Sequence, residues 1–255
     1  MKRGQITLFL IFVIILVIAI GFVFYTSDLN KKAPFDPSNT INSVSERNSI
    51  KFYTQQCLDK VLKDALKRVG ENGGYIYRTP KLKIQFTEDY ILTYLYIDRE
   101  KFLPDINIIQ SDIEKYINNN IRYCVQDFIF YKGRGWSTQI PDVKSNVLIT
   151  EEDVVATVDF PVEFKRNGLS LNLGRAYARD PVPLKKIVQE VSNILEDVDN
   201  AQQKIDNGEI PDTPMKIFKR NGLLFLNYQY PDTGRFLWLI KDNEFKFFFA
   251  TNLET

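Results

Sequence analysis

Residues 6–25 read ITLFLIFVIILVIAIGFVFY, a run of 20 residues from Ile6 to Tyr25 that contains no charged side chain. At a rise of 1.5 Å per residue, a helix of this length spans about 30 Å, the thickness of the hydrocarbon core of a bilayer. Inside lipid the backbone has to satisfy its own hydrogen bonds, so the run predicts a transmembrane helix. We place this helix at residues 5–26 and expect it to separate a short N-terminal segment from a larger outer domain.

The charges beside this run predict its orientation. Lys2 and Arg3 precede it, and positively charged residues stay on the cytoplasmic side of a membrane. Residues 1–4 are therefore expected in the cytoplasm, residues 27–38 form a polar linker, and residues 39–255 fold outside. The expected partner of the run is the lipid bilayer. The expected localisation is the cell membrane, single-pass, with an extracytoplasmic C-terminal domain.

Two other interpretations of the run remain open. A cleaved secretory signal has an apolar stretch of about 7–15 residues followed by a small-residue cleavage site. This run is longer, and residues 22–27, FVFYTS, contain no such site. A buried core helix would need cover on every side, which is difficult for a helix at a chain terminus. A retained membrane anchor fits the run best.

The first residues carry a resemblance to a known family. Residues 2–8, KRGQITL, resemble the class III signal of archaeal type IV pilin-like precursors. The resemblance implies cleavage by a prepilin peptidase between Gly4 and Gln5, after which the apolar helix serves as a filament core or a membrane anchor. Such pilins usually carry Glu at the fifth mature position, where this chain has Phe9, and this difference favours an anchored monomer. The remainder is similar to an archaeal single-pass surface protein.

The composition excludes several classes of chemistry. The chain has no His, so it cannot form a Ser-His-Asp triad, a His proton shuttle or a His metal site. Its two Cys are too few for a structural zinc site. Residues 70–74 are glycine-rich but lack the G-K-[ST] ending of a phosphate loop. We find no catalytic, cofactor-binding or metal-binding motif, and we expect no cofactor.

The charge balance bears on the partners. The net charge of the chain is +1, which gives no general basis for nucleic-acid binding. Lys2 and Arg3 are the only charges before Asp28, so the rest of the chain has a net charge of −1. An outer domain of this charge is not expected to be drawn to an anionic membrane surface. The expected partners are therefore the bilayer, through residues 6–25, and other proteins of the cell envelope, and no nucleic acid.

Hydrophobic periodicity predicts an α+β outer domain of mixed helices and antiparallel sheet, with possible subdomains at residues 39–135 and 140–255. A capping box of Ser111 and Glu114 is expected to start the second helix. The expected helices are residues 42–69, 111–127 and 184–205. The expected strands are residues 75–78, 82–86, 90–97, 143–150, 154–164, 223–229, 236–241 and 245–250, of which the last three look like an antiparallel meander.

One six-residue segment, FKRNGL, occurs twice, at residues 164–169 and 218–223. Asn-Gly accepts positive φ at both positions, so each copy predicts a two-residue hairpin turn. Two interpretations are open: two turns of like chemistry, or a duplicated substructure. The Lys-Arg pairs are candidate anion contacts, although exposed charges beside a turn are usually solvated.

Cys57 and Cys124 both lie on the apolar stripe of an expected helix. Disulfides form and persist outside the cell, so the predicted orientation favours one bridge between the two. The bridge would tie the first outer helix to the second. Two buried free thiols are the alternative, because Cys is often fully buried. Cysteines this far apart do not form a CxxC redox motif.

The sequence thus predicts a membrane-anchored cell-surface binding or structural protein without evident catalytic activity. The first alternative is a type IV pilin-like filament subunit, processed after Gly4. The second is a membrane-anchored carboxylate-dependent hydrolase, with Glu151, Glu152 and Asp153 as candidate carboxylates. The acidic residues at 196–199 are interpreted as a solvated helix face.

Overall fold

The computed structural model describes residues 37–77, 83–85, 91–140, 142–208, 217–229 and 234–253. The chain divides into two compact units, Met1–Asn48 and Ser49–Thr255, and the first is described only in its helical residues 37–48. The expected transmembrane helix and the expected processing site at Gly4 and Gln5 lie outside the described residues. Among the helices of the described ranges, none is both long and apolar enough to cross a bilayer.

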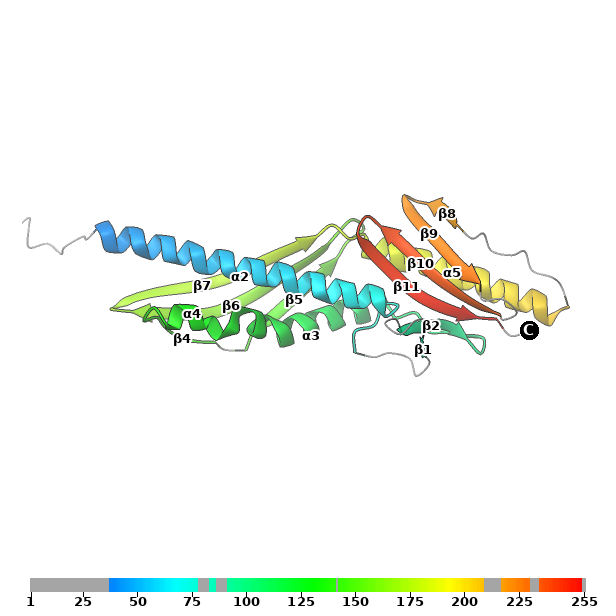
Figure 1. Cartoon of the computed structure of the whole chain (residues 1–255), viewed down its shortest axis with the longest axis horizontal. Coiled ribbons are helices and arrows are strands. Elements are labelled where there is room, and N and C mark those ends of the chain that lie inside the picture. The colour runs from blue at the N-terminus through cyan, green and yellow to red at the C-terminus, as the bar shows by residue number, and fades with distance from the viewer. Residues whose placement is uncertain are drawn as a thin grey trace, which may run out of the picture. The chain divides into compact units, whose positions relative to one another are not determined.

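The second unit is α+β, as the sequence predicts (Figure 1). Its helical elements are α2 (Pro37–Glu71, which begins in the first unit), α3 (Ile106–Val125), η1 (Gln126–Phe128), α4 (Ile129–Lys132) and α5 (Leu184–Asp206). The described strands form two sheets. The four-stranded sheet contains β4 (Ser137–Gln139), β5 (Lys144–Ile149), β6 (Val154–Arg166) and β7 (Leu169–Asp180). The seven-stranded sheet contains β1 (Lys83–Gln85), β2 (Ile91–Ile97), β3 (Glu100–Lys101), β8 (Ile217–Arg220), β9 (Leu223–Gln229), β10 (Arg235–Asp242) and β11 (Phe245–Asn252).

The four-stranded sheet is built on β6. This strand pairs antiparallel with β7 along one side and with β5 and then β4 along the other. Its side chains alternate between buried and more exposed, because successive residues of a strand point to opposite faces. The buried set is Val154, Ala156, Val158, Phe160, Val162 and Phe164. The helices α2 and α3 lie along this sheet (Figure 1), and their own apolar stripes complete the core.

Side chains from these two helices bind two of the outer strands of the four-stranded sheet. On β7, the Gln55 amide of α2 donates to the Tyr177 carbonyl and accepts from the Tyr177 N–H at 3.4 Å. On β5, the Glu114 carboxylate of α3 accepts from the Val147 N–H at 2.9 Å. Unpaired backbone groups at a sheet edge are a template for pairing with another molecule. The helices therefore cover the sheet and also occupy part of its edges on β7 and β5.

The start of α3 corrects a sequence prediction. The helix begins at Ile106, and the Asp105 carboxylate caps it by accepting from the Asn107 N–H at 2.7 Å. The predicted capping box of Ser111 and Glu114 is therefore wrong. An earlier polar residue already satisfies the first free N–H groups of the helix. Glu114 lies inside the helix, where its side chain is available to β5.

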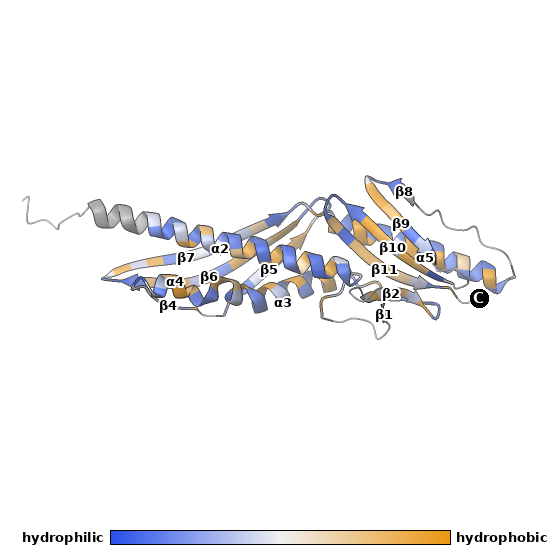
Figure 2. Cartoon of the chain, viewed as in Figure 1, coloured by the Kyte–Doolittle hydropathy of each residue, from blue (hydrophilic) through white to orange (hydrophobic). Residues whose placement is uncertain are grey.

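The seven-stranded sheet has the order β1-β2-β11-β10-β9-β8, with β3 paired to β2. The predicted meander is confirmed in β9, β10 and β11, which pair antiparallel in sequence order. One pairing has no sequence signal: β2 runs parallel to β11, with Tyr94 opposite Ala250. The helix α5 packs on one face of this sheet. Figure 2 shows the mixed hydrophilic and hydrophobic residues of α5, as expected for a helix with one covered face.

The glycine-rich stretch at residues 70–74 serves the packing of the two sheets. A β-carbon at Gly70 would collide with the Lys246 carbonyl of β11, so only glycine lets the end of α2 approach that strand. Gly73 and Gly74 then turn the chain with φ of 64° and 97°, values that side chains other than glycine rarely adopt. The expected strand at 75–78 is not formed in its described residues 75–77.

Candidate functional site

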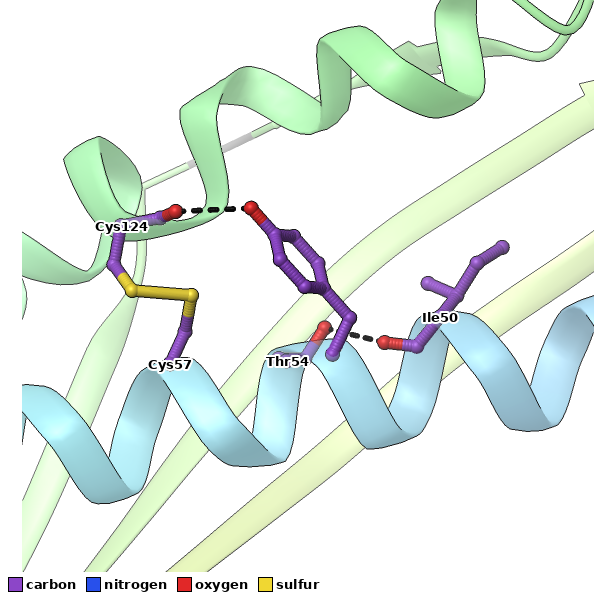
Figure 3. The surroundings of a disulfide bond; sticks show 5 residues. Ile50, Thr54, Cys57 and Cys124 are labelled. Carbon is purple, nitrogen blue, oxygen red and sulfur yellow. Dashed lines mark hydrogen bonds between the residues drawn. A yellow bond between two sulfur atoms is a disulfide. The ribbon is translucent and has the colours of Figure 1, made fainter.

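The predicted disulfide between Cys57 and Cys124 is confirmed. It joins α2 to α3, with the two Cα atoms 5.6 Å apart and the cysteines separated by 67 residues in the chain (Figure 3). A crosslink that closes a loop of this length stabilises a fold by about 4 kcal/mol in chain-entropy terms. The bridge fastens two helices that are otherwise held by side-chain packing and hydrogen bonds.

A hydrogen bond lies beside the bridge. The Tyr53 hydroxyl, one helical turn before Cys57, donates to the Cys124 carbonyl at 3.1 Å (Figure 3). That carbonyl is near the end of α3, where the last C=O groups of a helix have no partner within the helix. Tyr53 therefore satisfies one of these carbonyl groups, and its ring contacts the rings of Phe128 and Tyr131. The buried Thr54 hydroxyl donates to the Ile50 carbonyl of its own helix at 2.9 Å.

Directly after the bridge the chain makes an unusual turn. Gln126, Asp127 and Phe128 have φ of 48°, 50° and 56°, so three consecutive residues other than glycine lie in the left-handed region. Each costs about 1–2 kcal/mol relative to right-handed backbone. The Arg122 guanidinium reaches across the turn to Asp127 at 2.7 Å and helps to hold it. Strain of this kind persists only where the surrounding structure imposes it.

A cluster of five aromatic side chains supplies that surrounding structure. Phe128 is 1% exposed and packs edge-on against Phe164 of β6, with ring centroids 5.0 Å apart. The same two rings contact Tyr131 of α4, and Tyr53 contacts both Phe128 and Tyr131. Trp136 closes the cluster against Phe164. The left-handed turn thus buries Phe128 where a continuous helix would carry it elsewhere.

The outer side of the same turn is apolar and exposed. Ile129 and Phe130 of α4 are 66% and 60% exposed, although the pair comes directly after buried Phe128. The Arg134 guanidinium lies 4.3 Å from the Phe130 ring centroid, which is within the range of a cation–π contact. We call α4 with its neighbours Arg134 and Trp136 the tip of the domain. Ser49, the first residue of the second unit, lies at this tip, with its hydroxyl 3.2 Å from that of Tyr131.

Both copies of the FKRNGL segment form the predicted hairpin turns. Asn167 and Gly168 join β6 to β7, and Asn221 and Gly222 join β8 to β9, all four with positive φ. The two turns belong to different sheets, which agrees with the interpretation of two turns of like chemistry. The Lys-Arg pairs were candidate anion contacts, and each arginine has a partner within the protein, described next.

The two arginines of the repeat bind different groups. Arg166 lies on the Trp136 ring at the tip, 4.4 Å from its centroid, and donates to the Arg134 carbonyl at 3.4 Å. Arg220 pairs at 3.1 Å with Glu190, a carboxylate of α5 whose side chain is 5% exposed. The amide of Asn221 donates to the other oxygen of Glu190 at 2.6 Å. The contacts of the second turn therefore hold β8 and β9 against α5.

The candidate carboxylates of the hydrolase interpretation lie at the β5–β6 turn. Asp153 accepts from Thr150 at 2.6 Å and pairs with Arg179 of β7, contacts that hold the pKa of its carboxyl below the ordinary value. Glu151 pairs with Lys185 of α5 at 2.7 Å. These carboxylates are thus used to fix the turn to neighbouring elements, and the described contacts do not set two of them facing each other across a cleft.

The acidic stretch on α5 differs in part from its interpretation. Glu196 and Asp197 are exposed, as expected for a solvated face. Asp199, in contrast, accepts from the buried Tyr96 hydroxyl at 3.0 Å and pairs with Lys101 at 3.3 Å. Burial, followed by the hydrogen bond to Asp199, raises the pKa of Tyr96 to about 12. This contact joins α5 to β2 and β3.

A shallow depression lies over β4 and β6. It is lined by Ser137, Thr138, Gln139, Pro161, Glu163 and Lys165. Its two charges are satisfied internally, since Glu163 pairs with Lys165 at 2.8 Å and accepts from Ser170 at 2.5 Å. The Lys165 and Ser170 hydrogen bonds hold the pKa of Glu163 below its ordinary value. In the ranges that the structure describes, no three His, Cys, Asp or Glu side chains gather as metal ligands.

No protein-family model, curated protein or solved structure matches this chain. Function therefore has to be inferred from the residues themselves. The sequence located the disulfide, but the exposed Ile129 and Phe130 were missed. They are hidden from sequence patterns because the left-handed turn that displays them contains no glycine, the usual signal for positive φ.

Proposed function

We propose that this chain is a membrane-anchored cell-surface protein with a binding or structural role. In this proposal residues 6–25 form the anchor and residues 39–255 lie outside the membrane. The disulfide between Cys57 and Cys124 is the observation that carries it, because disulfides persist in oxidising compartments and are rare in the cytosol. The orientation expected from Lys2 and Arg3 exposes both cysteines to such a compartment.

The position of the bridge also suits an anchored domain. In sequence, α2 is the first described element after the apolar run, and the bridge fixes it to α3. A pull that reached α2 would be shared with α3 through the covalent bridge. Gln55 and Glu114 bind backbone groups of β7 and β5, which limits pairing of those strands with other molecules at a crowded surface. The binding partners proposed are other proteins of the envelope.

The pilin-like alternative keeps one observation in its favour. Residues 2–5, KRGQ, resemble the processing signal. A pilin stem usually continues as a helix into its head, whereas here Asp28, Pro34 and Pro37 follow the apolar run. The hydrolase alternative gains no support from the described residues, because Glu151 and Asp153 already serve structural contacts.

The orientation is tested on the full chain in intact cells. We expect added protease to digest the outer domain from outside while a cytoplasmic marker stays intact. The protein should also migrate faster on a gel before reduction than after it. The double variant Cys57→Ser/Cys124→Ser is the control and should show no such difference. Digestion only after lysis would contradict the proposed orientation.

Mass spectrometry of the mature N-terminus separates the anchored protein from the processed subunit. The proposal expects a chain that still begins with Met1 or Lys2. A mature chain that begins with Gln5 would favour the pilin-like alternative. A matched variant, Gly4→Leu, should then block that cleavage, while Phe22→Leu, a change far from the motif, should leave it unaffected.

A further inference from the structure

The tip exposes two large apolar side chains in succession, among the most exposed of the described residues together with Phe52 and Tyr123. Ile129 and Phe130 are adjacent in sequence and each exposes well over half of its side chain. Lys132 and Arg134, which follow them, are also exposed. We call these four residues the tip patch. Figure 2 shows α4 as a hydrophobic turn at one end of the four-stranded sheet. An apolar pair beside two cations is a composition typical of surfaces that lie in the headgroup region of a membrane.

The backbone at residues 126–128 indicates that the fold imposes the exposure of Ile129 and Phe130. A right-handed continuation of α3 would avoid the positive φ of Gln126, Asp127 and Phe128. Instead the left-handed turn places Phe128 inside and leaves Ile129 and Phe130 outside. The disulfide at Cys124 lies just before the turn and fixes its start. Strained backbone of this kind is concentrated at functional sites.

The local charge of the tip differs from the average of the outer domain. From residue 122 to residue 136 the cations are Arg122, Lys132 and Arg134, all exposed, and the carboxylate is Asp127. Asp127 is already paired with Arg122. Among the described residues no carboxylate pairs with Lys132 or Arg134. The net charge of −1 over the whole region after residue 27 therefore conceals a positive tip.

The size of the tip patch favours a bilayer over a protein partner. A stable protein interface buries roughly 800 Å² on each partner, far more than two side chains offer. A bilayer needs no matching surface, and the proposed anchor keeps the domain beside it, which raises the effective concentration of a weak contact. The chain enters the second unit at Ser49, whose hydroxyl lies 3.2 Å from that of Tyr131 of α4.

We propose that the tip patch is a membrane contact, in which Ile129 and Phe130 enter the headgroup region of the bilayer and Lys132 and Arg134 bind anionic lipid headgroups. This inference rests on the proposed anchoring by residues 6–25. It assigns a second point of attachment to the domain, so the domain would lie against the membrane rather than extend freely from it. Each cation near the surface adds to the attraction to anionic lipid, and salt weakens this attraction.

The experiment uses the full chain in vesicles of brominated phosphatidylcholine, with and without phosphatidylglycerol, since bromine on the acyl chains quenches nearby tryptophan. The probe is Phe130→Trp. Tyr228→Trp, at an exposed aromatic on the seven-stranded sheet, is the matched control. The native Trp136 and Trp238 are buried, and the natural chain measured under the same conditions supplies their contribution as the background. Flotation of the vesicles is measured first, to establish that the chain is anchored.

We expect Phe130→Trp to lose emission and shift to the blue in brominated vesicles, more so with phosphatidylglycerol, while Tyr228→Trp does not respond. Adding Lys132→Glu and Arg134→Glu should abolish the dependence on phosphatidylglycerol. Lys219→Glu and Lys241→Glu, exposed lysines of the other sheet, should not. Equal responses of the two tryptophan probes would overturn the inference. So would a shift that follows protein density instead of lipid, which would assign the patch to a second copy of the chain. Failure to float would refute the anchoring itself, and the tip contact with it.

Discussion

The two FKRNGL turns, residues 164–169 and 218–223, have the same sequence and the same backbone but different partners. Asn167 and Asn221 have φ of 48° and 52°, and the glycines that follow also have positive φ. The arginine of the first turn lies on the buried ring of Trp136, whereas that of the second pairs with the buried carboxylate of Glu190. Local sequence thus determines the shape of a turn, and the elements packed against it determine what its side chains do.

The same difference extends to the two sheets that carry these turns. The two helices on the four-stranded sheet are fastened to each other covalently, through Cys57 and Cys124, next to an aromatic cluster. The seven-stranded sheet has no such bridge among its described residues, and polar contacts of Glu190 and of Asp199 add to the apolar packing of α5 on it. One end of the domain is therefore expected to depend on redox conditions, and the other on charge.

Removing the disulfide should have the largest effect. We expect the double variant Cys57→Ser/Cys124→Ser to lose about 4 kcal/mol of unfolding free energy, because the unfolded chain regains the entropy that the crosslink removes. Urea unfolding under oxidising and reducing conditions measures this loss. The reduced natural protein should match the double variant. A loss below about 1 kcal/mol would mean that the bridge adds little to the packing of α2 on α3.

Replacing each arginine of the repeat tests whether the two turns differ in energy as they do in contacts. Arg220→Met leaves the buried Glu190 carboxylate without its cation and should cost roughly 1–3 kcal/mol. Arg166→Met loses a cation–π contact and a long, exposed hydrogen bond to the Arg134 carbonyl, and it should cost about 0.5–1 kcal/mol. Urea unfolding of both variants gives the difference. Equal losses would show that the burial of Glu190 is unimportant.

Substitutions of the two asparagines separate the stability of the turn itself from that of its contact with Glu190. Asn167→Ala and Asn221→Ala both place alanine at positive φ, which should cost about 1 kcal/mol each. Asn221→Ala also removes the hydrogen bond to Glu190 and should lose about 2 kcal/mol in all. Asn221→Gly keeps the turn but not the hydrogen bond, so it should fall between the natural protein and Asn221→Ala. If Asn221→Gly matched the natural protein, the contact with Glu190 would contribute nothing.

Features that depend on short stretches of chain could be predicted from the sequence. The hairpin turns follow from Asn-Gly, α5 and the meander of β9 to β11 follow from periodicity, and the disulfide follows from two cysteines on apolar helix faces. The expected helices and strands describe much of the second unit. Each of these signals is complete within a few turns or a single strand pair.

Features set by distant packing could not be predicted. The parallel pairing of β2 with β11 joins segments that are far apart in the sequence, and no pattern in either strand indicates the other as its partner. Glu114 matched a capping box but binds β5, because Asp105 provides the cap. The left-handed turn at 126–128 has no glycine and exists because the aromatic cluster holds Phe128. The tip patch depends on that turn and was therefore missed.

The pH dependence should show the smallest effect and the clearest division between the two sheets. Hydrogen bonds from Thr150 and Arg179 lower the pKa of Asp153, so its contribution to stability is present above the ordinary value of 3.8 and lost as pH falls through the lower folded value. Burial raises the pKa of Tyr96 from 10.0 to about 12, so its contribution is full below pH 10 and lost as pH rises through 12.

Acid is therefore expected to weaken the four-stranded sheet through Asp153, and alkali the seven-stranded sheet through Tyr96. Unfolding free energies measured from acid to alkaline pH should lose part of their acid slope in Asp153→Asn and part of their alkaline slope in Tyr96→Phe. Each variant serves as the control for the other, because Asp153 belongs to the β5–β6 turn and Tyr96 to β2. If one substitution flattened both slopes, the two sheets would be coupled in stability, and the contrast between a covalently fastened end and a polar one would be lost.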